Sequence, residues 1–122
     1  MLRGEMLHAE LRGSVYDNFA SGNYDTSVRD AFVQVEIVVR ETANLSAALV
    51  GVKLMREAFN PNTGKLTDMA LPMSERERMA DLFCGAIGTF KNPLSHRKVG
   101  NTDPAPVIEE LLFASRLLRF LR

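Results

Sequence analysis

Apolar positions recur every three or four residues along most of the chain, which is the spacing of amphipathic helices. The first such stretch predicts a helix from about Leu2 to Ala20, with His8 on its apolar face as a packed or capping residue, and Ser21-Gly22-Asn23 breaks it. The second predicts a helix from about Tyr24 to Ala43. Its valine-rich run from Phe32 to Val38 also fits a strand, but the helical pattern continues too far for one, so a helix is favoured.

Three more helices follow from the same pattern and from signals at their ends. A shorter helix is expected from about Ala47 to Phe59, followed by a loop over residues 60–73. The next begins at Ser74, because Ser74-Glu75-Arg76-Glu77 has the form of a capping box, and it ends at Pro93. The last begins at Asp103-Pro104 and is apolar almost all round, which indicates a central position or a subunit interface.

These elements predict an all-α fold, an up-and-down helical bundle of four to five helices, in a single domain over residues 1–122. Apolar residues make up 46% and charged residues 25%, a mix typical of a globular domain with one core. Lys+Arg and Asp+Glu both number 15, so any contact with nucleic acid must come from a local basic patch. No apolar run is long enough for a membrane-spanning helix, and no membrane partner is expected.

Several classes of chemistry are disfavoured. The single cysteine, Cys84, excludes an internal disulfide and a cysteine-built metal site, and with no signal peptide a reducing cytoplasm is expected. No histidine pair has ligand spacing and no glycine-rich phosphate loop is present, so neither metal nor cofactor is expected. A serine hydrolase lacks its G-x-S-x-G elbow, and a DNA-reading helix-turn-helix lacks a polar, basic recognition helix.

The stretch that carries candidate chemistry runs from Phe90 to Lys98, where the helix beginning at Ser74 ends. It holds His96, one of two histidines in the chain. The window from Leu82 to Thr102 contains no Asp or Glu, yet it contains three cations: Lys91, Arg97 and Lys98.

Two interpretations of this stretch are open. In the first, His96 folds back beside Lys91 across one turn after Pro93 has ended the helix. Histidine titrates near neutral pH and can act as a general acid or base, while a fixed cation stabilises a phosphorane-like transition state. With Asn92 as a polar helper, this pair suits metal-free cleavage of RNA by its own 2′-hydroxyl. In the second, Pro93 simply stops the helix and the charges are solvated.

Two features elsewhere bear on the same stretch. Glu36 and Arg40 lie four residues apart and form either an exposed ion pair or a support, in which Glu36 faces the basic stretch and orients it. A row of small residues runs beside an apolar helix face and would let another helix approach closely. Lys91 projects from the end of that row, where the partner helix would meet it. That row is Ala80, Cys84 and Gly88.

The segment Gly88-Thr89-Phe90-Lys91-Asn92-Pro93-Leu94-Ser95-His96-Arg97 resembles the end of the third long helix of HEPN domains, which carry an Arg-x4-6-His motif. More narrowly, it is similar to the Ymh-type branch of that superfamily, whose signature is G-x-x-R-N-P-x-x-H. The likeness spans roughly residues 6 to 121, and four more segments carry it: Gly22-Asn23-Tyr24, Val28-Arg29-Asp30-Ala31-Phe32 with Glu36, Leu54-Met55-Arg56-Glu57-Ala58-Phe59, and Leu112-Phe113-Ala114-Ser115 through Leu118.

This resemblance implies an all-α up-and-down bundle and a homodimer whose motifs face each other across the interface. It also implies metal-independent ribonuclease activity in phage defence or toxin–antitoxin systems, with an antitoxin or another defence-system protein as partner. Lys91 stands where the family has arginine, which keeps the charge but loses the two-pronged grip on phosphate.

The leading hypothesis is therefore a dimeric ribonuclease or a ribonuclease-derived protein. In it, Lys91 binds the scissile phosphate, His96 moves protons and Asn92 positions the substrate. Supporting residues orient this group or bind substrate: Glu36 and Arg40 for the first role, Arg97 and Lys98 for the second. The alternatives are a non-catalytic RNA- or nucleotide-binding module, and a dimerisation or adaptor domain in which the motif is structural.

Overall fold

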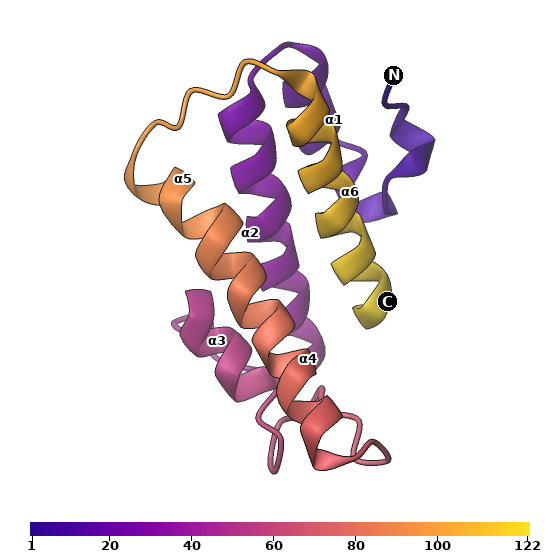
Figure 1. The fold of residues 1–122 in the computed structure, drawn as a ribbon, viewed down its shortest axis with the longest axis vertical. Helices are drawn as coiled ribbons and strands as arrows, with labels where there is room; N and C mark the ends of the chain where they lie inside the picture. The colour runs from indigo at the N-terminus through magenta and orange to yellow at the C-terminus, as the bar shows by residue number, and fades with distance from the viewer.

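The computed structural model describes all 122 residues and consists of helices without strands (Figure 1). One helix is continuous through α4, a π-helical turn and α5; counted once, it gives five helices, and the predicted all-α bundle is confirmed. The elements are α1 (Ser14–Ala20), α2 (Tyr24–Ala43), α3 (Gly51–Ala58), α4 (Met73–Ala86), the π-helical turn (Ile87–Lys91), α5 (Asn92–His96) and α6 (Pro104–Leu121).

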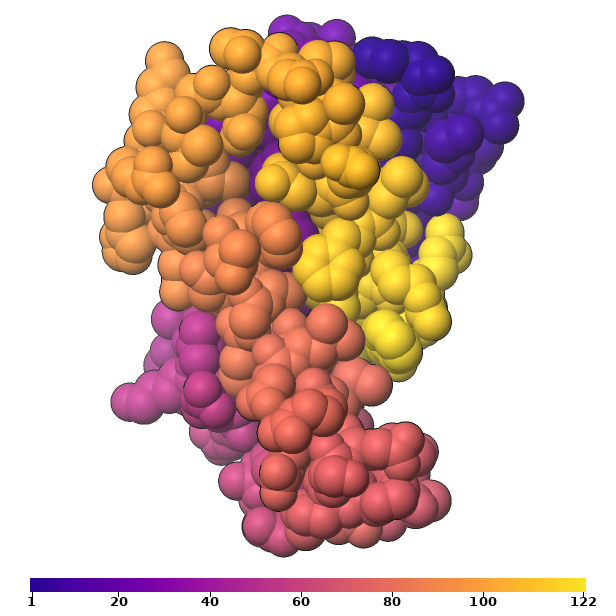
Figure 2. All heavy atoms as spheres, viewed as in Figure 1, coloured from indigo at the N-terminus to yellow at the C-terminus, as the bar shows by residue number.

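The central helix of the bundle is α2. It packs against α1, α3, α6 and the π-helical turn, and Figure 2 shows α4–α5 and α6 covering one face, with α2 visible only in narrow gaps. Its bounds are those predicted, and the valine-rich run is helical throughout. Because α2 packs on several sides, its apolar residues at helical spacing are all fully buried: Val28, Ala31, Phe32, Val35, Val38 and Val39.

The first helix is shorter than predicted. Two 3₁₀ turns, Gly4–Met6 and Ala9–Leu11, replace its first half, and α1 begins only after Gly13. The His8 backbone N–H donates to the Ser115 hydroxyl instead of to a helical carbonyl, and Gly13 has non-helical dihedrals. Four apolar residues of this segment, spaced four residues apart, are nevertheless all buried: Leu7, Leu11, Val15 and Phe19.

The histidine in this region, His8, is a packed capping residue, as predicted. It is 8% exposed, and its Nδ1 accepts a hydrogen bond of 3.1 Å from the Glu10 backbone N–H. It lies in the N-terminal segment beside α6 and has no part in the candidate site.

The segment between α2 and α3 doubles back along α2. The Arg40 Nε donates to the Leu49 carbonyl at 3.0 Å. The Gly51 N–H donates to the carboxylate of Glu36, which lies one helical turn before Arg40 in α2. Because residues 44–50 are used for this return, α3 begins at Gly51 and not at Ala47 as predicted. Gly51 has a φ of 65°, a conformation that favours glycine.

The N-terminal capping of α4 differs from the prediction. The helix begins at Met73 with Pro72 as its N-cap, and no side chain caps it. Ser74 therefore lies inside the first turn and the predicted capping box does not form. Arg76 instead ties the preceding loop to the helix, by donating to the carbonyls of Leu71, Pro61 and Met69.

Pro93 does not end the helix, contrary to the prediction. The preceding residues form a π-helical turn, in which the Asn92 N–H donates to the Ile87 carbonyl five residues earlier. Pro93 then lies in the first turn of α5, where the missing proline N–H costs little. The helix ends three residues later at His96, and Arg97 has extended dihedrals.

The last helix begins at Asp103-Pro104 as predicted, with an Asp103 oxygen accepting from the Ala105 N–H at 3.0 Å. One side of α6 packs on α2, while Leu112 and Phe120 stay 38% and 46% exposed. Neither α6 nor any other helix combines the length and the apolar character that crossing a membrane requires.

Candidate functional site

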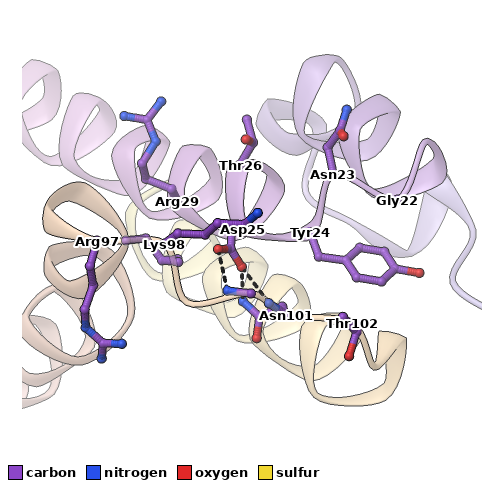
Figure 3. Close-up of a pocket in the computed structure, with 12 residues that line it drawn as sticks. Gly22, Asn23, Tyr24, Asp25, Thr26, Arg29, Arg97, Lys98, Asn101 and Thr102 are labelled. Carbon is purple, nitrogen blue, oxygen red and sulfur yellow. Dashed lines mark hydrogen bonds between the residues drawn. The ribbon is translucent and has the colours of Figure 1, made fainter.

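A polar cleft lies between the start of α2 and the loop over residues 97–102, which joins α5 to α6 (Figure 3). Its volume is about 660 Å³, and only Tyr24 and Leu94 contribute apolar walls. Its other lining residues are polar, charged or glycine: Gly22, Asn23, Asp25, Thr26, Arg29, Arg97, Lys98, Gly100, Asn101 and Thr102.

The loop is fixed to α2 by a single carboxylate, that of Asp25. One oxygen accepts from the N–H groups of Val99 and Gly100 at 2.9 and 2.8 Å. The other accepts from the backbone and side-chain N–H groups of Asn101 at 2.9 and 2.7 Å. Burial raises the pKa of Asp25, but hydrogen bonds from Gly100, Asn101 and Val99 outweigh it, and the pKa lies below its ordinary value. The carboxylate is therefore ionised at neutral pH.

Three cations line the cleft. Arg29 forms a partly exposed ion pair with Asp30 at 2.8 Å, whereas Arg97 and Lys98 form no ion pair and are exposed. In Figure 3, Arg29 and Arg97 lie on the same side of Asp25. Asp25 is the cleft's only acidic lining residue and already accepts four hydrogen bonds, so the cleft suits an anion.

Lys91 lies in a second place, the seam between α2 and α3. Its Nζ is 3.3 Å from a Glu36 oxygen, and the two side chains are 16% and 4% exposed. The other Glu36 oxygen accepts from the Gly51 N–H. The predicted contact between Glu36 and the basic stretch is therefore present, and it joins α2, the π-helical turn and the start of α3.

The residues next to this ion pair differ in their contacts. Arg40 does not form the exposed pair with Glu36, because its guanidinium donates to the Leu49 carbonyl and Glu36 is buried. Asn92 is half-buried, and its side-chain oxygen lies close to Gly51. Both residues thus adjoin the segment that leads into α3.

His96 is exposed as the last residue of α5 and makes no side-chain hydrogen bond or ion pair. Lys91 is paired with Glu36 in the seam, and no hydrogen bond joins it to His96, the other member of the predicted catalytic pair. The predicted residues thus fall into two groups with His96 apart from both: Lys91, Asn92, Glu36 and Arg40 in the seam, and Arg97 and Lys98 in the cleft.

The sequence did not single out Asp25 as a site residue. It is an acidic residue in the first turn of a long helix, where it would be expected to complement the helix dipole. Its partners lie 74 to 76 residues away, and no spacing rule connects such positions. Arg29 was named from the sequence only as part of the family-like segment Val28-Arg29-Asp30-Ala31-Phe32.

A smaller hollow of about 140 Å³ is bounded by the same loop and shares Leu94, Arg97 and Asn101 with the cleft. It also contains Glu110 of α6. Burial, and then the neighbouring Glu109 carboxylate, raises the pKa of Glu110 above its ordinary value. Glu110 accepts none of the hydrogen bonds that engage Asp25, so this hollow suits an anion less well than the cleft does. No cluster of three or more histidine, cysteine or carboxylate side chains that could hold a metal ion is present.

Comparison with protein families matches residues 5–121 to a family described as "Protein of unknown function (Hypoth_ymh)". The chain belongs to the Ymh family. The match covers the α2 start, the seam and the loop over residues 97–102, so the cleft and the Lys91–Glu36 pair both lie inside the Ymh domain. Comparison with curated proteins finds no match, and neither does comparison with solved structures.

Proposed function

We propose that this Ymh protein binds RNA and holds the phosphate backbone of a single strand in the cleft between α2 and the loop over residues 97–102. The observation that carries the proposal is the charge arrangement. Arg97 and Lys98 are exposed without ion-pair partners, and Asp25, the only acid of the cleft, is engaged by four N–H groups. Phosphate is the anion that such cations bind in nucleic acids.

The size and lining of the cleft favour a single strand over a duplex. A volume of about 660 Å³ lies in the range that holds a nucleotide-sized ligand. Tyr24 and Leu94 are its only apolar walls, so base stacking contributes little and the backbone is the main feature recognised. The side chains of Asn23, Asn101 and Thr102 supply hydrogen-bonding groups suited to a ribose 2′-hydroxyl.

The seam is a weaker candidate for phosphate binding. For Lys91 to reach a phosphate it would leave Glu36, whose side chain is only 4% exposed. Separating a buried ion pair costs about 3–5 kcal/mol, because one charge stays buried without its partner. Lys91 thus remains paired with Glu36 in this conformation, and Arg97 and Lys98 are the cations available to a ligand.

The test is fluorescence anisotropy with a labelled single-stranded RNA. The double variant Arg97→Ala/Lys98→Ala should raise Kd at least about tenfold, because hydrogen bonds to charged groups contribute about 1.5–3 kcal/mol each. It should also make the dependence of log K on log salt shallower by about 1.4 units, about 0.7 for each cation removed from a single-strand site. The matched control is Lys65→Ala, an exposed lysine in the loop between α3 and α4, far from the cleft.

Competitors identify the ligand class. Unlabelled RNA should displace the probe better than DNA of the same sequence, and mononucleotides should displace it weakly. Equal affinity of the wild type and the Arg97→Ala/Lys98→Ala variant would contradict the cleft as the binding site. If the wild type binds no RNA at all, the adaptor alternative is favoured.

The second candidate is a metal-independent endoribonuclease of the HEPN type, and the Glu36–Lys91 contact favours it. An orienting carboxylate is what that hypothesis expects beside Lys91. Because Lys91 is paired with Glu36 and His96 is exposed without a hydrogen bond to Lys91, the catalytic site of this candidate would be composite, with one residue from each protomer of a homodimer. A role in phage defence or a toxin–antitoxin pair, with an antitoxin as partner, belongs to this candidate.

Cleavage distinguishes the two candidates. A nuclease of this type should cut RNA in EDTA, require the 2′-hydroxyl and leave 2′,3′-cyclic phosphate ends. His96→Ala should then lower the rate by about 10²–10⁴-fold, the usual contribution of general acid–base catalysis. Lys91→Arg should preserve or raise the rate, because arginine grips phosphate with two prongs. Activity that survives His96→Ala but disappears in EDTA would point to a different chemistry.

A further inference from the structure

The loop over residues 97–102 has little internal support. Between Lys98 and Thr102 it makes no backbone-to-backbone hydrogen bond. Its N–H groups at Val99, Gly100 and Asn101 all donate to Asp25 on α2. Figure 3 shows these bonds meeting at the Asp25 carboxylate. The first donor, Val99, directly follows Lys98 in the chain.

We infer that Asp25 is a positioning residue for the cleft: its carboxylate holds the loop in the conformation that presents Arg97 and Lys98 to an RNA phosphate. This inference rests on the proposed RNA binding and goes beyond it, because Asp25 itself repels phosphate. A carboxylate is a costly residue in a site for an anion, since like charges disfavour each other. The four hydrogen bonds that Asp25 accepts from the loop stabilise the loop conformation, and this stabilisation offsets the repulsion.

The charge of Asp25 makes the inference testable by the sign of an effect. Asp25→Asn removes a negative charge from the cleft, so electrostatics alone predicts tighter RNA binding. The asparagine side chain is close in size, but its NH₂ group cannot accept a hydrogen bond. The hydrogen bonds that the loop donates to one of the two Asp25 oxygens are therefore lost. If Asp25 positions the loop, affinity falls instead, by about fivefold or more for the hydrogen bonds lost.

The matched control is Asp30→Asn, which removes the same charge from the same helix. Asp30 makes no bond to the loop and pairs only with Arg29. Its substitution should leave RNA affinity unchanged or raise it. Amide hydrogen exchange at Val99, Gly100 and Asn101 provides an independent reading, because these groups should lose protection in Asp25→Asn and keep it in Asp30→Asn.

A third arm separates positioning from general destabilisation. In the Arg97→Ala/Lys98→Ala background, adding Asp25→Asn should not lower the residual affinity further, because the cations through which Asp25 acts are gone. Circular dichroism should show the same helix content in all variants.

The outcomes are distinct. Weaker binding by Asp25→Asn, unchanged or tighter binding by Asp30→Asn and no further loss in the triple variant support the inference. Binding by Asp25→Asn that equals or exceeds the wild type overturns the inference alone, as does a further loss in the triple variant. Failure of the wild type to bind RNA overturns the proposed function and this inference together.

Discussion

At the scale of single residues, Glu36 is the most consequential side chain of the seam. Its carboxylate is buried, yet both oxygens are used, one by Lys91 and one by the Gly51 N–H. A buried charge is tolerated only when it is paired and hydrogen-bonded. Glu36 therefore determines at once where Lys91 points and where α3 begins.

We predict that Lys91→Met lowers the free energy of unfolding by about 3 kcal/mol, the lower end for breaking a buried ion pair, because Lys91 is still partly exposed. Glu36→Gln keeps an acceptor for the Gly51 N–H and removes only the charge. The double variant should therefore lose less than the sum of the two single losses. Urea denaturation measures all three, and additive losses would show that the pair contributes nothing.

The same residues show what sequence could and could not provide. The spacing of Glu36 and Arg40 allowed an ion pair on one helix, but spacing says nothing about the burial that turns Glu36 inward. That Glu36 faces the basic stretch was predicted as an alternative, and its contact with Lys91 is observed. The cleft could not be predicted, because Asp25 meets its partners only through the tertiary fold.

At the scale of elements, the row of small residues on α4 and the π-helical turn packs against α3 of the same chain. The Cys84 thiol lies 3.9 Å from the Val52 carbonyl, and a Cβ on Gly88 would lie 3.6 Å from the Val52 side chain. The row was predicted to allow close approach of a helix, and that helix is intramolecular. It therefore provides no evidence for a subunit interface.

We predict opposite effects for two substitutions of Gly88. Gly88→Ala should raise the free energy of unfolding by up to about 1 kcal/mol, because the new methyl group meets only an ordinary contact and alanine favours helix. Gly88→Leu should lower it by about 1–3 kcal/mol by overpacking the contact between the π-helical turn and α3. Thermal unfolding measures both, with Gly85→Ala as the control where no neighbour is near. A tolerated leucine would contradict this packing.

Helix bounds were predictable where packing agrees with local pattern, as in α2 and α6. They were not predictable where a tertiary contact replaces a helical hydrogen bond. His8 donates to Ser115, and Gly51 donates to Glu36, so both neighbouring helices start later than their patterns indicate. Pro93 looked like a stop signal only because a π-helical turn cannot be recognised from residue types.

At the scale of the whole molecule, α6 provides the remaining argument for self-association. It leaves Leu112 and Phe120 exposed, and Phe120 is held by contacts with Phe83 and Arg116. Ordered, exposed aromatic side chains are typical anchors of protein interfaces. This proposal is independent of the small-residue row.

We predict a homodimer at tens of micromolar protein, measured by sedimentation velocity. Phe120→Glu should raise the dimer Kd at least about tenfold, because loss of an aromatic anchor typically costs 2 kcal/mol or more. Met69→Glu, which places the same charge at another exposed apolar position, should have little effect. A wild-type protein that sediments as a monomer would remove the composite nuclease site and leave RNA binding by the single chain.

The π-helical turn before α5 has a consequence for how this fold can change. Such a turn takes up one residue more than an ordinary helical ladder, so the helix that follows keeps its direction and phase. Deleting one residue within it would convert it into an ordinary helical turn and leave α5 in place. The same deletion elsewhere in α4 removes no extra residue, so it would rotate α5 by about 100° relative to the start of α4 and carry the basic end of the helix away from Asp25. The π-helical turn is therefore where this helix can lose a residue while its cations stay at the same surface.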